Sequence, residues 1–209
     1  MTTDAQFWNS LAESYSRKPV DNPDAFERKI ALTKARMGPD QVVLDIGCGT
    51  GSLALRLAET GAQLHGLDIS SEMVRIARGK AVSAGVDNVV FHEGTVAQLQ
   101  AFGPGSLDGV CAYSILHLVP DRPAVLAKAF EWLKPGGFFV SSNVCLGGTW
   151  FPYRPMLTVM RWAGRAPWVD IVSADQAIAE IRAAGFVDVE RPDVGASSTV
   201  VFLTARKPA

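Results

Sequence analysis

Short apolar runs alternate along the chain with segments whose apolar positions recur every three or four residues. Residues 41–46 form a nearly continuous, β-branched apolar run, as expected of a parallel strand covered on both faces. Residues 52–60 repeat their apolar positions at helical spacing until Gly61 ends the pattern. The same reasoning predicts strands at residues 41–46, 62–68, 88–92, 107–113, 138–142, 186–190 and 198–205, and helices at residues 4–16, 23–37, 52–60, 70–84, 122–132 and 173–184. Strands that alternate with helices predict an α/β fold with a doubly wound, mostly parallel sheet.

A glycine-rich turn follows the first predicted strand and contains Gly47, Gly49 and Gly51. Without a Cβ the backbone can adopt positive φ, and a ligand can approach the main chain closely. The next helix begins with free N–H groups and the positive end of its dipole, which favour a phosphate or a carboxylate. Asp68 closes the second strand, where its carboxylate can accept two hydrogen bonds from a ribose diol. The pattern therefore predicts the first half of a nucleotide-binding βαβ unit.

A dinucleotide site is an alternative explanation of the same turn. Gly49, Gly51 and Ala54 match a permissive G-x-G-x-x-A pattern, which leaves a nicotinamide-dependent oxidoreductase open. Asp45 argues against it, because a buried negative charge at the end of the strand would lie close to a pyrophosphate. The same carboxylate suits a ligand that carries an ammonium group.

Four segments between residues 42 and 142 resemble, in order, the motifs of class I S-adenosylmethionine-dependent methyltransferases, in particular the small-molecule branch that includes the quinone-biosynthesis enzymes. They are Val-Leu-Asp-Ile-Gly-Cys-Gly-Thr-Gly at 43–51, Gly-Leu-Asp-Ile-Ser-Ser-Glu-Met at 66–73, Ser-Leu-Asp-Gly-Val-Cys-Ala-Tyr-Ser-Ile-Leu-His-Leu-Val at 106–119, and Leu-Lys-Pro-Gly-Gly-Phe-Phe-Val at 133–140. The resemblance implies one methyltransferase domain over residues 1–209, seven strands of which the last is antiparallel, and S-adenosyl-L-methionine as the cofactor.

The resemblance also implies a set of cofactor-binding residues. Asp68 is expected to anchor the ribose, Ile69 to pack on the adenine, and Tyr15 to close over the methionine part of the cofactor, unless Tyr15 is a core anchor of an amphipathic helix. Thr95 and Val96 stand where the family usually has an Asp-Ala pair, which predicts weaker adenine recognition or a compensating backbone contact. The full set is Tyr15, Asp45, Gly47, Cys48, Gly49, Gly51, Asp68, Ile69, Met73, Thr95, Val96 and Tyr113.

Catalysis of methyl transfer leaves a weak sequence signature. A sulfonium donor needs an in-line nucleophile in a dry pocket, and a base only when the acceptor is a hydroxyl or a protonated amine. Tyr113, Ser114 and His117 follow the fourth strand, at the edge where open α/β sheets bind ligands. His117 is a candidate general base, with a structural histidine as the alternative, and Tyr113 is a candidate for positioning the acceptor.

The two flanks of the motif region carry further expectations. Residues 1–38 are expected to form an amino-terminal helical cap, and residues 144–170 to form a lid or an acceptor-binding insertion. The second segment suits a lid over an apolar acceptor, an amphipathic element on a membrane interface, or a helical insertion packed on the sheet with snorkelling arginines. Its aromatic, thioether and basic residues are Trp150, Phe151, Tyr153, Met156, Met160, Trp162, Trp168, Arg154, Arg161 and Arg165.

Composition narrows the function classes. With 209 residues, 48% hydrophobic residues and a formal charge of -1, the chain fits one compact domain, and no basic face is indicated for nucleic acid. Residues 1–10 show no secretory signal, no apolar run is long enough for a membrane span, and the three cysteines lack metal-ligand spacing. We therefore expect a cytoplasmic enzyme without a metal, which methylates a small apolar or aromatic acceptor such as a quinone or a lipid. A non-catalytic cofactor-binding module of the same fold is the remaining alternative, and the oligomeric state stays open.

Overall fold

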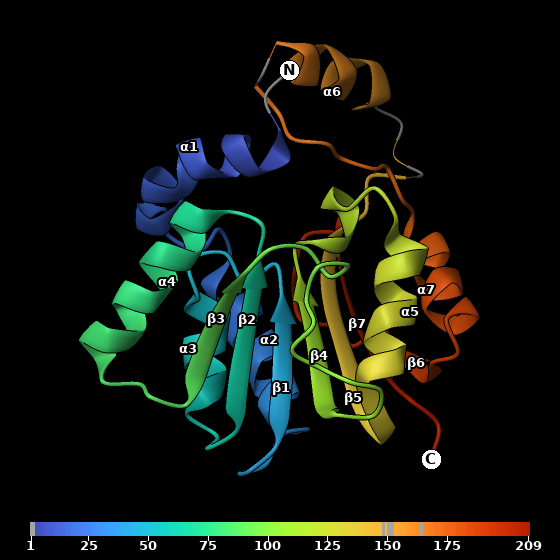
Figure 1. The fold of residues 1–209 in the computed structure, drawn as a ribbon. Coiled ribbons are helices and arrows are strands. Elements are labelled where there is room, and N and C mark those ends of the chain that lie inside the picture. The colour runs from blue at the N-terminus through green and yellow to red at the C-terminus, as the bar shows by residue number, and fades with distance from the viewer. Residues whose placement is uncertain (1–2, 148, 150–152, 164) are drawn as a thin grey trace.

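The computed structural model describes residues 3–147, 149, 153–163 and 165–209, and a seven-stranded sheet lies at its centre (Figure 1). The strand order is β3-β2-β1-β4-β5-β7-β6. Neighbours from β3 to β5 pair in parallel, whereas β7 runs antiparallel to both β5 and β6, so the predicted antiparallel last strand is confirmed. The strands are β1 (Val42–Ile46), β2 (Gln63–Asp68), β3 (Val89–Glu93), β4 (Leu107–Tyr113), β5 (Leu133–Val144), β6 (Val187–Glu190) and β7 (Val200–Arg206).

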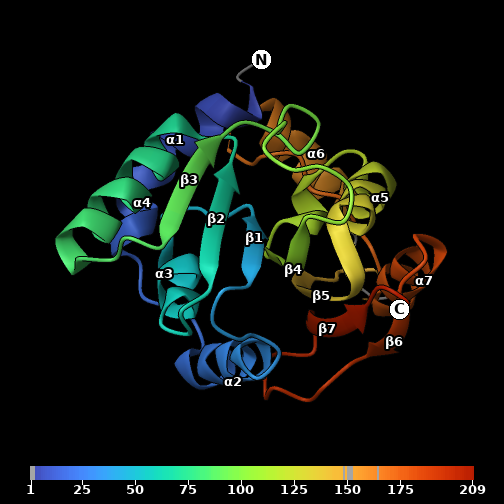
Figure 2. The same ribbon diagram turned by 60° about the horizontal axis from the view of Figure 1, so that its bottom comes forward.

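Helices cover both faces of the sheet, which confirms the doubly wound architecture (Figure 2). On one face, Ile30 and Leu57 of two helices pack with Val43, Val140 and Phe202 of the sheet. On the other face, the carboxyl-terminal helices pack against a separate group of strand side chains. The helices are α1 (Asp4–Arg17), α2 (Pro23–Lys34), α3 (Ser52–Ala58), α4 (Ser71–Ala84), α5 (Arg122–Trp132), α6 (Tyr153–Trp162) and α7 (Ala174–Ala183), with a short 3₁₀ turn η1 at Leu116–Leu118.

The ends of the helices follow from local sequence chemistry. Thr3 and Gln6 form a reciprocal capping box at the start of α1, and the Ser70 side chain accepts from the Met73 N–H at the start of α4. Gly85 ends α4 in a left-handed conformation with φ of 66°, as the sequence predicted. These caps define the ends of two neighbouring helices: in Figure 1, α4 runs beside the sheet next to β3, and α1 lies above the carboxyl ends of the strands.

Three parts of the chain differ from the expected elements. β5 begins at Leu133 instead of residue 138, and α6 is a helix that the periodicity did not single out. Within the expected cap of residues 1–38, only α1 lies above the carboxyl ends of the strands, because α2 packs against one face of the sheet. Trp150 and Phe151 of the expected 144–170 segment lie outside the described residues.

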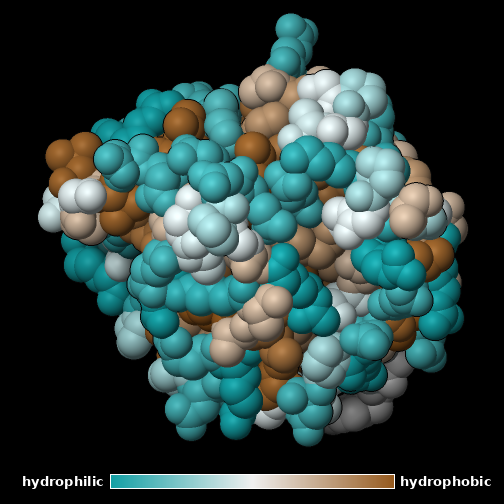
Figure 3. Space-filling model, turned by 90° about the horizontal axis from the view of Figure 1, so that it is seen from below, coloured by the Kyte–Doolittle hydropathy of each residue, from teal (hydrophilic) through white to brown (hydrophobic). Residues whose placement is uncertain are grey.

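The opposite end of the sheet has a mostly hydrophilic surface (Figure 3). A groove there carries paired charges, including Lys134 with Asp108 at 2.8 Å. The polar character of this end contrasts with the apolar cavity at the carboxyl ends of the strands.

Candidate functional site

A cavity of about 600 Å³ opens at the carboxyl ends of β1, β2 and β4, where the strand order reverses. Open α/β sheets bind their ligands at this switch point, because the loops from neighbouring strands separate there. The structure brings nine of the twelve expected cofactor residues to its wall: Tyr15, Gly47, Gly49, Asp68, Ile69, Met73, Thr95, Val96 and Tyr113. Asp45, Cys48 and Gly51 do not line the cavity.

Asp68 is held in place by two backbone donors. The Gly49 N–H donates to Oδ2 and the Ser70 N–H donates to Oδ1, each at 2.9 Å. Burial raises the pKa of Asp68, although the backbone hydrogen bonds oppose that shift. The carboxylate is thus oriented in the cavity wall, with lone pairs left to accept further hydrogen bonds from a diol.

Asp45 is a buried carboxyl group without a described partner. Its side chain is 1% exposed, and neither oxygen has a hydrogen-bond partner among the described residues. Burial and the nearby Asp68 raise the pKa of Asp45 to about 8. A ligand with positive charge would stabilise the ionised form, whereas a pyrophosphate would oppose it, so the site favours a cationic ligand.

The glycine turn combines a ligand-facing part with a packing part. Gly47, Gly49 and Gly51 all have positive φ, between 53° and 79°. A Cβ at Gly47 would lie 2.6 Å from the Ile115 side chain, whereas at Gly49 the nearest atom is a Tyr15 ring carbon at 3.8 Å. Gly51 instead faces the core, since its Cβ would lie 2.9 Å from Ala77 and Phe91. The side chain of Cys48 is also buried in that core cluster, so only backbone atoms of the turn can serve the ligand there.

The side of the cavity where the family resemblance predicts adenine binding is largely apolar. Ile69 and Met73 line it from the end of β2 and the first turn of α4, and Val96 lines it from the loop after β3. The Thr95 backbone and hydroxyl both donate to Gln98 Oε1 at 3.0 Å, so the hydroxyl oxygen keeps lone pairs to accept from a ligand. This geometry is compatible with the neutral adenine contact expected from the sequence.

The two candidate catalytic residues differ in how they lie relative to the cavity. The ring of Tyr113 lines the cavity, but its hydroxyl contacts Thr33 Oγ1 at 2.7 Å and donates to the Lys29 carbonyl at 3.2 Å. His117 is 8% exposed and lines a different, much smaller cavity beside Asn143. Burial lowers the pKa of His117 to about 4, so the ring is neutral at pH 7. The described arrangement gives His117 a structural position behind the cavity wall.

Part of the wall had no assigned role in the sequence. Trp8 and Asp4 line the cavity from α1, and Ser114 lines it after β4 with a φ of 56°, a strained conformation for a residue other than glycine. Others come from the 3₁₀ turn and the start of α5: Leu118, Val119, Pro120, Asp121, Ala124, Val125 and Lys128. The sequence could have indicated these last residues as part of the site, because they follow the fourth strand of the predicted open sheet.

The structure shows no described group of three or more histidine, cysteine or carboxylate side chains that could hold a metal ion. Among the described helices, none combines the length and hydrophobicity that crossing a membrane requires. A glycine turn and an oriented carboxylate at the switch point define a Rossmann-like α/β protein that binds a nucleoside-containing ligand.

A family model described as a methyltransferase domain matches residues 38–181, and the chain belongs to that family. The match confirms the methyltransferase class indicated by the four sequence motifs, and it sets aside the nicotinamide-dependent alternative.

The chain is similar to two curated proteins named ubiquinone biosynthesis O-methyltransferase. The protein from Albidiferax ferrireducens is 39% identical over 104 residues, which cover 50% of this chain and 41% of that protein. The protein from Serratia proteamaculans is 35% identical over 127 residues, which cover 61% of this chain and 52% of that protein. The chain therefore spans about half the length of the curated relatives it matches.

The fold is also similar to that of a solved phosphoethanolamine N-methyltransferase from Haemonchus contortus, with a TM-score of 0.81 and 19% identity. The similarity covers 100% of this chain and 61% of that chain, whose structure contains S-adenosylhomocysteine and a phosphorylated amine. At this level of identity the comparison supports the fold, and the acceptor must be argued from the site.

Proposed function

We propose that this protein transfers the methyl group of S-adenosyl-L-methionine to a hydroxyl of a small aromatic acceptor, of the kind used in quinone biosynthesis. The observation that carries the proposal is Asp68, whose two oxygens are fixed by backbone donors in the wall of an apolar cavity beside the glycine turn. The two relatives named ubiquinone biosynthesis O-methyltransferase support an aromatic hydroxyl as the acceptor.

The residues present fit the cofactor at each part of the cavity. Asp68 can accept from the ribose hydroxyls, and Ile69 and Val96 offer apolar contact to the adenine. Asp45, which is buried and does not line the cavity, favours positive charge on a ligand nearby. When bound, S-adenosylmethionine supplies a sulfonium methyl group for transfer. Trp8 supplies one apolar wall and helps to exclude water from the reacting groups.

In this proposal, methyl transfer is accelerated mainly because the two reactants are held close together. Such placement can lower the activation free energy by several kcal/mol, about 7 or more in favourable cases. An acceptor hydroxyl must also lose a proton. Besides Asp68, which is assigned to the ribose, the cavity wall contains the carboxylates of Asp4 and Asp121, which can accept it directly or through water, whereas His117 lies behind the wall. The general-base role suggested for His117 by its sequence position thus passes to a carboxylate in this proposal.

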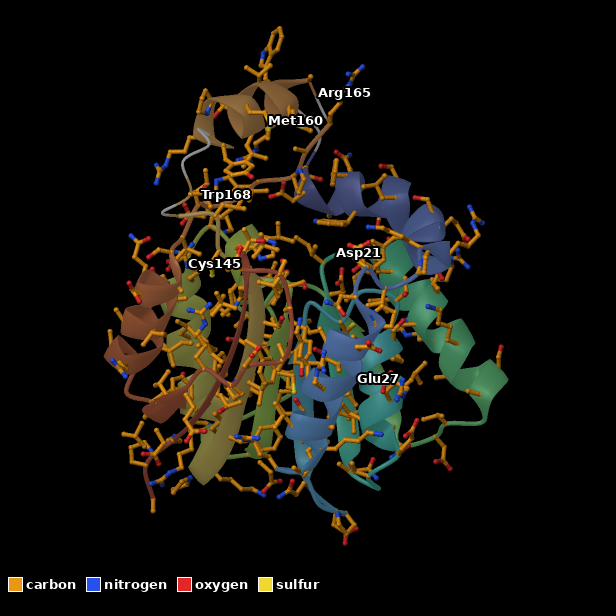
Figure 4. The ribbon with its side chains drawn as sticks, turned by 180° about the vertical axis from the view of Figure 1, so that it is seen from behind. Asp21, Glu27, Cys145, Met160, Arg165 and Trp168 are labelled. Atoms are coloured by element: carbon orange, nitrogen blue, oxygen red, sulfur yellow. The ribbon has the colours of Figure 1, made fainter. Side chains whose placement is uncertain are left out.

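The segment of residues 144–170 supports a cover on the acceptor side of the cavity. The Trp168 N–H donates to Asp4 Oδ1 at 3.3 Å, and the Asp170 N–H donates to the His117 carbonyl at 2.8 Å. Figure 4 shows Trp168 between α6 and the rest of the molecule, with Arg165 pointing outward. We propose that α1 and the part of this segment around Trp168 together enclose the acceptor, within one methyltransferase domain.

The outer side of α6 supports a membrane-surface contact by the same segment. α6 has no buried residue, and the side chains of Val159 and Trp162 are 64% and 82% exposed. Arg154 and Arg161 add positive charge to the helix, so an anionic lipid surface is the partner that fits. Flotation with anionic vesicles is expected to recover the protein, and Trp162→Ala is expected to reduce recovery severalfold. Equal recovery with neutral vesicles, or no effect of the substitution, would remove this part of the proposal.

Calorimetric titration with S-adenosylhomocysteine tests the proposed function directly. We expect micromolar binding by the wild-type protein and a loss of about 100-fold or more in Asp68→Ala, because charge-assisted hydrogen bonds to both ribose hydroxyls disappear. Asp24→Ala, which removes an exposed carboxylate on α2, is the matched control and should bind normally.

Methyl transfer is then assayed with catechol-type phenols and detected by mass spectrometry. Tight cofactor binding with no transfer to any phenol would favour the non-catalytic binding module. Absence of cofactor binding would overturn the proposed function. We place the reaction in the cytoplasm, since all three cysteines are free and buried, as a reducing compartment allows.

A further inference from the structure

The side chain of Asn9 joins the amino-terminal helix α1 to the start of α4. Asn9 Oδ1 accepts from the Ser70 hydroxyl at 2.6 Å, from the Glu72 N–H at 3.3 Å and from the Ser71 hydroxyl at 3.4 Å. Ser70 is fully buried, so its hydroxyl has no solvent to replace Asn9 as a partner. Asn9 therefore helps to cap α4 from a helix 61 residues away in sequence.

Ser70 also contacts the ribose-binding carboxylate of the proposed function. Its N–H donates to Asp68 Oδ1, and the second oxygen of Asp68 accepts from the Gly49 N–H. A continuous series of hydrogen bonds thus joins Asn9, Ser70, Asp68 and Gly49. It connects α1 to the end of β2 and to the glycine turn.

The same helix forms part of the cavity wall. Trp8, the neighbour of Asn9 in sequence, lines the cavity, and so does Tyr15 near the other end of the helix. Successive residues of an α-helix point about 100° apart, so α1 can face the cavity with Trp8 while Asn9 holds it to α4. Helix α1 therefore contributes Trp8 and Tyr15 to the cavity wall and Asn9 to the contact with α4.

A second contact between the two helices is more exposed. Arg75 Nη2 lies 2.8 Å from Glu13 Oε1, and the two side chains are 57% and 62% exposed. Ion pairs of this kind contribute little, about 0–1 kcal/mol. Glu13 lies one turn beyond Asn9 and does not touch Ser70, so it offers a matched comparison at the same interface.

We propose that Asn9 is a positioning residue for the cofactor: it holds α1 closed over the nucleoside and fixes Ser70, and through it Asp68, in the orientation that binds the ribose. The inference rests on the proposed function. It assigns to α1 a role in retaining the cofactor, exerted through a hydrogen bond outside the cavity wall.

The test compares Asn9→Ala, Asn9→Asp and Glu13→Gln for the affinity and dissociation rate of S-adenosylhomocysteine. Asn9→Ala leaves a buried hydroxyl without an acceptor, and we expect about tenfold weaker binding through faster dissociation. Asn9→Asp keeps the acceptor oxygen at a helix N-terminus and should stay within about threefold of wild type. Glu13→Gln should stay within about twofold.

Thermal unfolding of the ligand-free variants separates positioning from general stability. Faster dissociation in Asn9→Ala at a temperature where every variant is fully folded, with rescue by Asn9→Asp, supports the inference. An unchanged dissociation rate in Asn9→Ala, or an equally faster rate in Glu13→Gln, would overturn the inference about Asn9. The proposed function would still stand in that case, provided that the wild-type protein binds S-adenosylhomocysteine. Wild-type protein that binds no S-adenosylhomocysteine would remove the proposed function and this inference together.

Discussion

Cofactor binding should release a proton from Asp45. Burial and Asp68 raise the pKa of this carboxyl to about 8, so about nine-tenths of ligand-free molecules hold the proton at pH 7. A ligand ammonium group bound roughly 5 Å from this carboxylate would, at an effective dielectric constant of about 20, stabilise it by about 3 kcal/mol. That energy corresponds to a pKa decrease of about 2 units, to about 6. Binding of S-adenosylmethionine at pH 7 is then expected to release about 0.8 proton per site.

Calorimetry in phosphate and in Tris buffer measures this release, because the observed binding enthalpy changes with the ionisation enthalpy of the buffer. Asp45→Asn keeps the shape of the side chain without a titratable proton, so the buffer dependence should disappear. The affinity of this variant should also fall about tenfold, because the attraction to the ammonium group is lost. Equal enthalpies in the two buffers for the wild-type protein would refute this account of Asp45.

The same shift sets the pH dependence of the ligand-free protein. The folded pKa of Asp45 lies above the ordinary value of 3.8. The protonated form therefore favours the folded state, and its contribution is complete below pH 3.8 and is lost as pH rises through about 8. Asp45→Asn should remove this loss, which urea unfolding at pH 6 and pH 9 would measure as a smaller difference than in wild type.

Two further predictions concern the turn and the buried histidine. Gly47→Ala should abolish cofactor binding and lower the free energy of unfolding by about 2 kcal/mol or more, because its Cβ would lie 2.6 Å from Ile115. Gly49→Ala should lower the free energy of unfolding by only about 1 kcal/mol, the cost of its positive φ. Equal free energies of unfolding for the two variants would contradict the steric argument. Since burial lowers the pKa of His117 to about 4, stability should fall by up to about 3 kcal/mol as pH decreases from 6.5 to 4. His117→Gln should remove that decrease in urea unfolding and leave turnover within about threefold; a turnover loss of 100-fold or more would restore the general base.

Much of the fold could be predicted because its patterns are local. The apolar run of β1 and the caps of α4 depend on neighbouring residues, and both were placed within one or two residues of their observed bounds. The start of β5 could not be found in this way. Lys134 and Gly136 interrupt the apolar pattern there, and the strand assignment depends on pairing with a neighbour that is distant in sequence.

In the candidate site, too, residues within one local motif could be predicted, whereas those whose position depends on tertiary packing could not. Gly47, Gly49 and Asp68 belong to contiguous motifs, and the structure brings them together as their spacing suggested. The orientation of the His117 and Cys48 side chains depends on tertiary packing. A side chain in a turn after a strand can face either the cavity or the protein core, and the sequence does not distinguish the two. The contact of Asn9 with Ser70 joins two helices across 61 residues and leaves no pattern in either segment.

The position of α1 has a practical consequence for handling the protein. Asp4 lines the cavity and accepts a hydrogen bond from Trp168, so a purification tag joined just before α1 would lie close to the cavity wall. The opposite end of the chain lies at the far end of the sheet in Figure 1. Tags and surface attachments for binding measurements therefore belong on the carboxyl-terminal side of β7, where they leave the entrance to the cavity free.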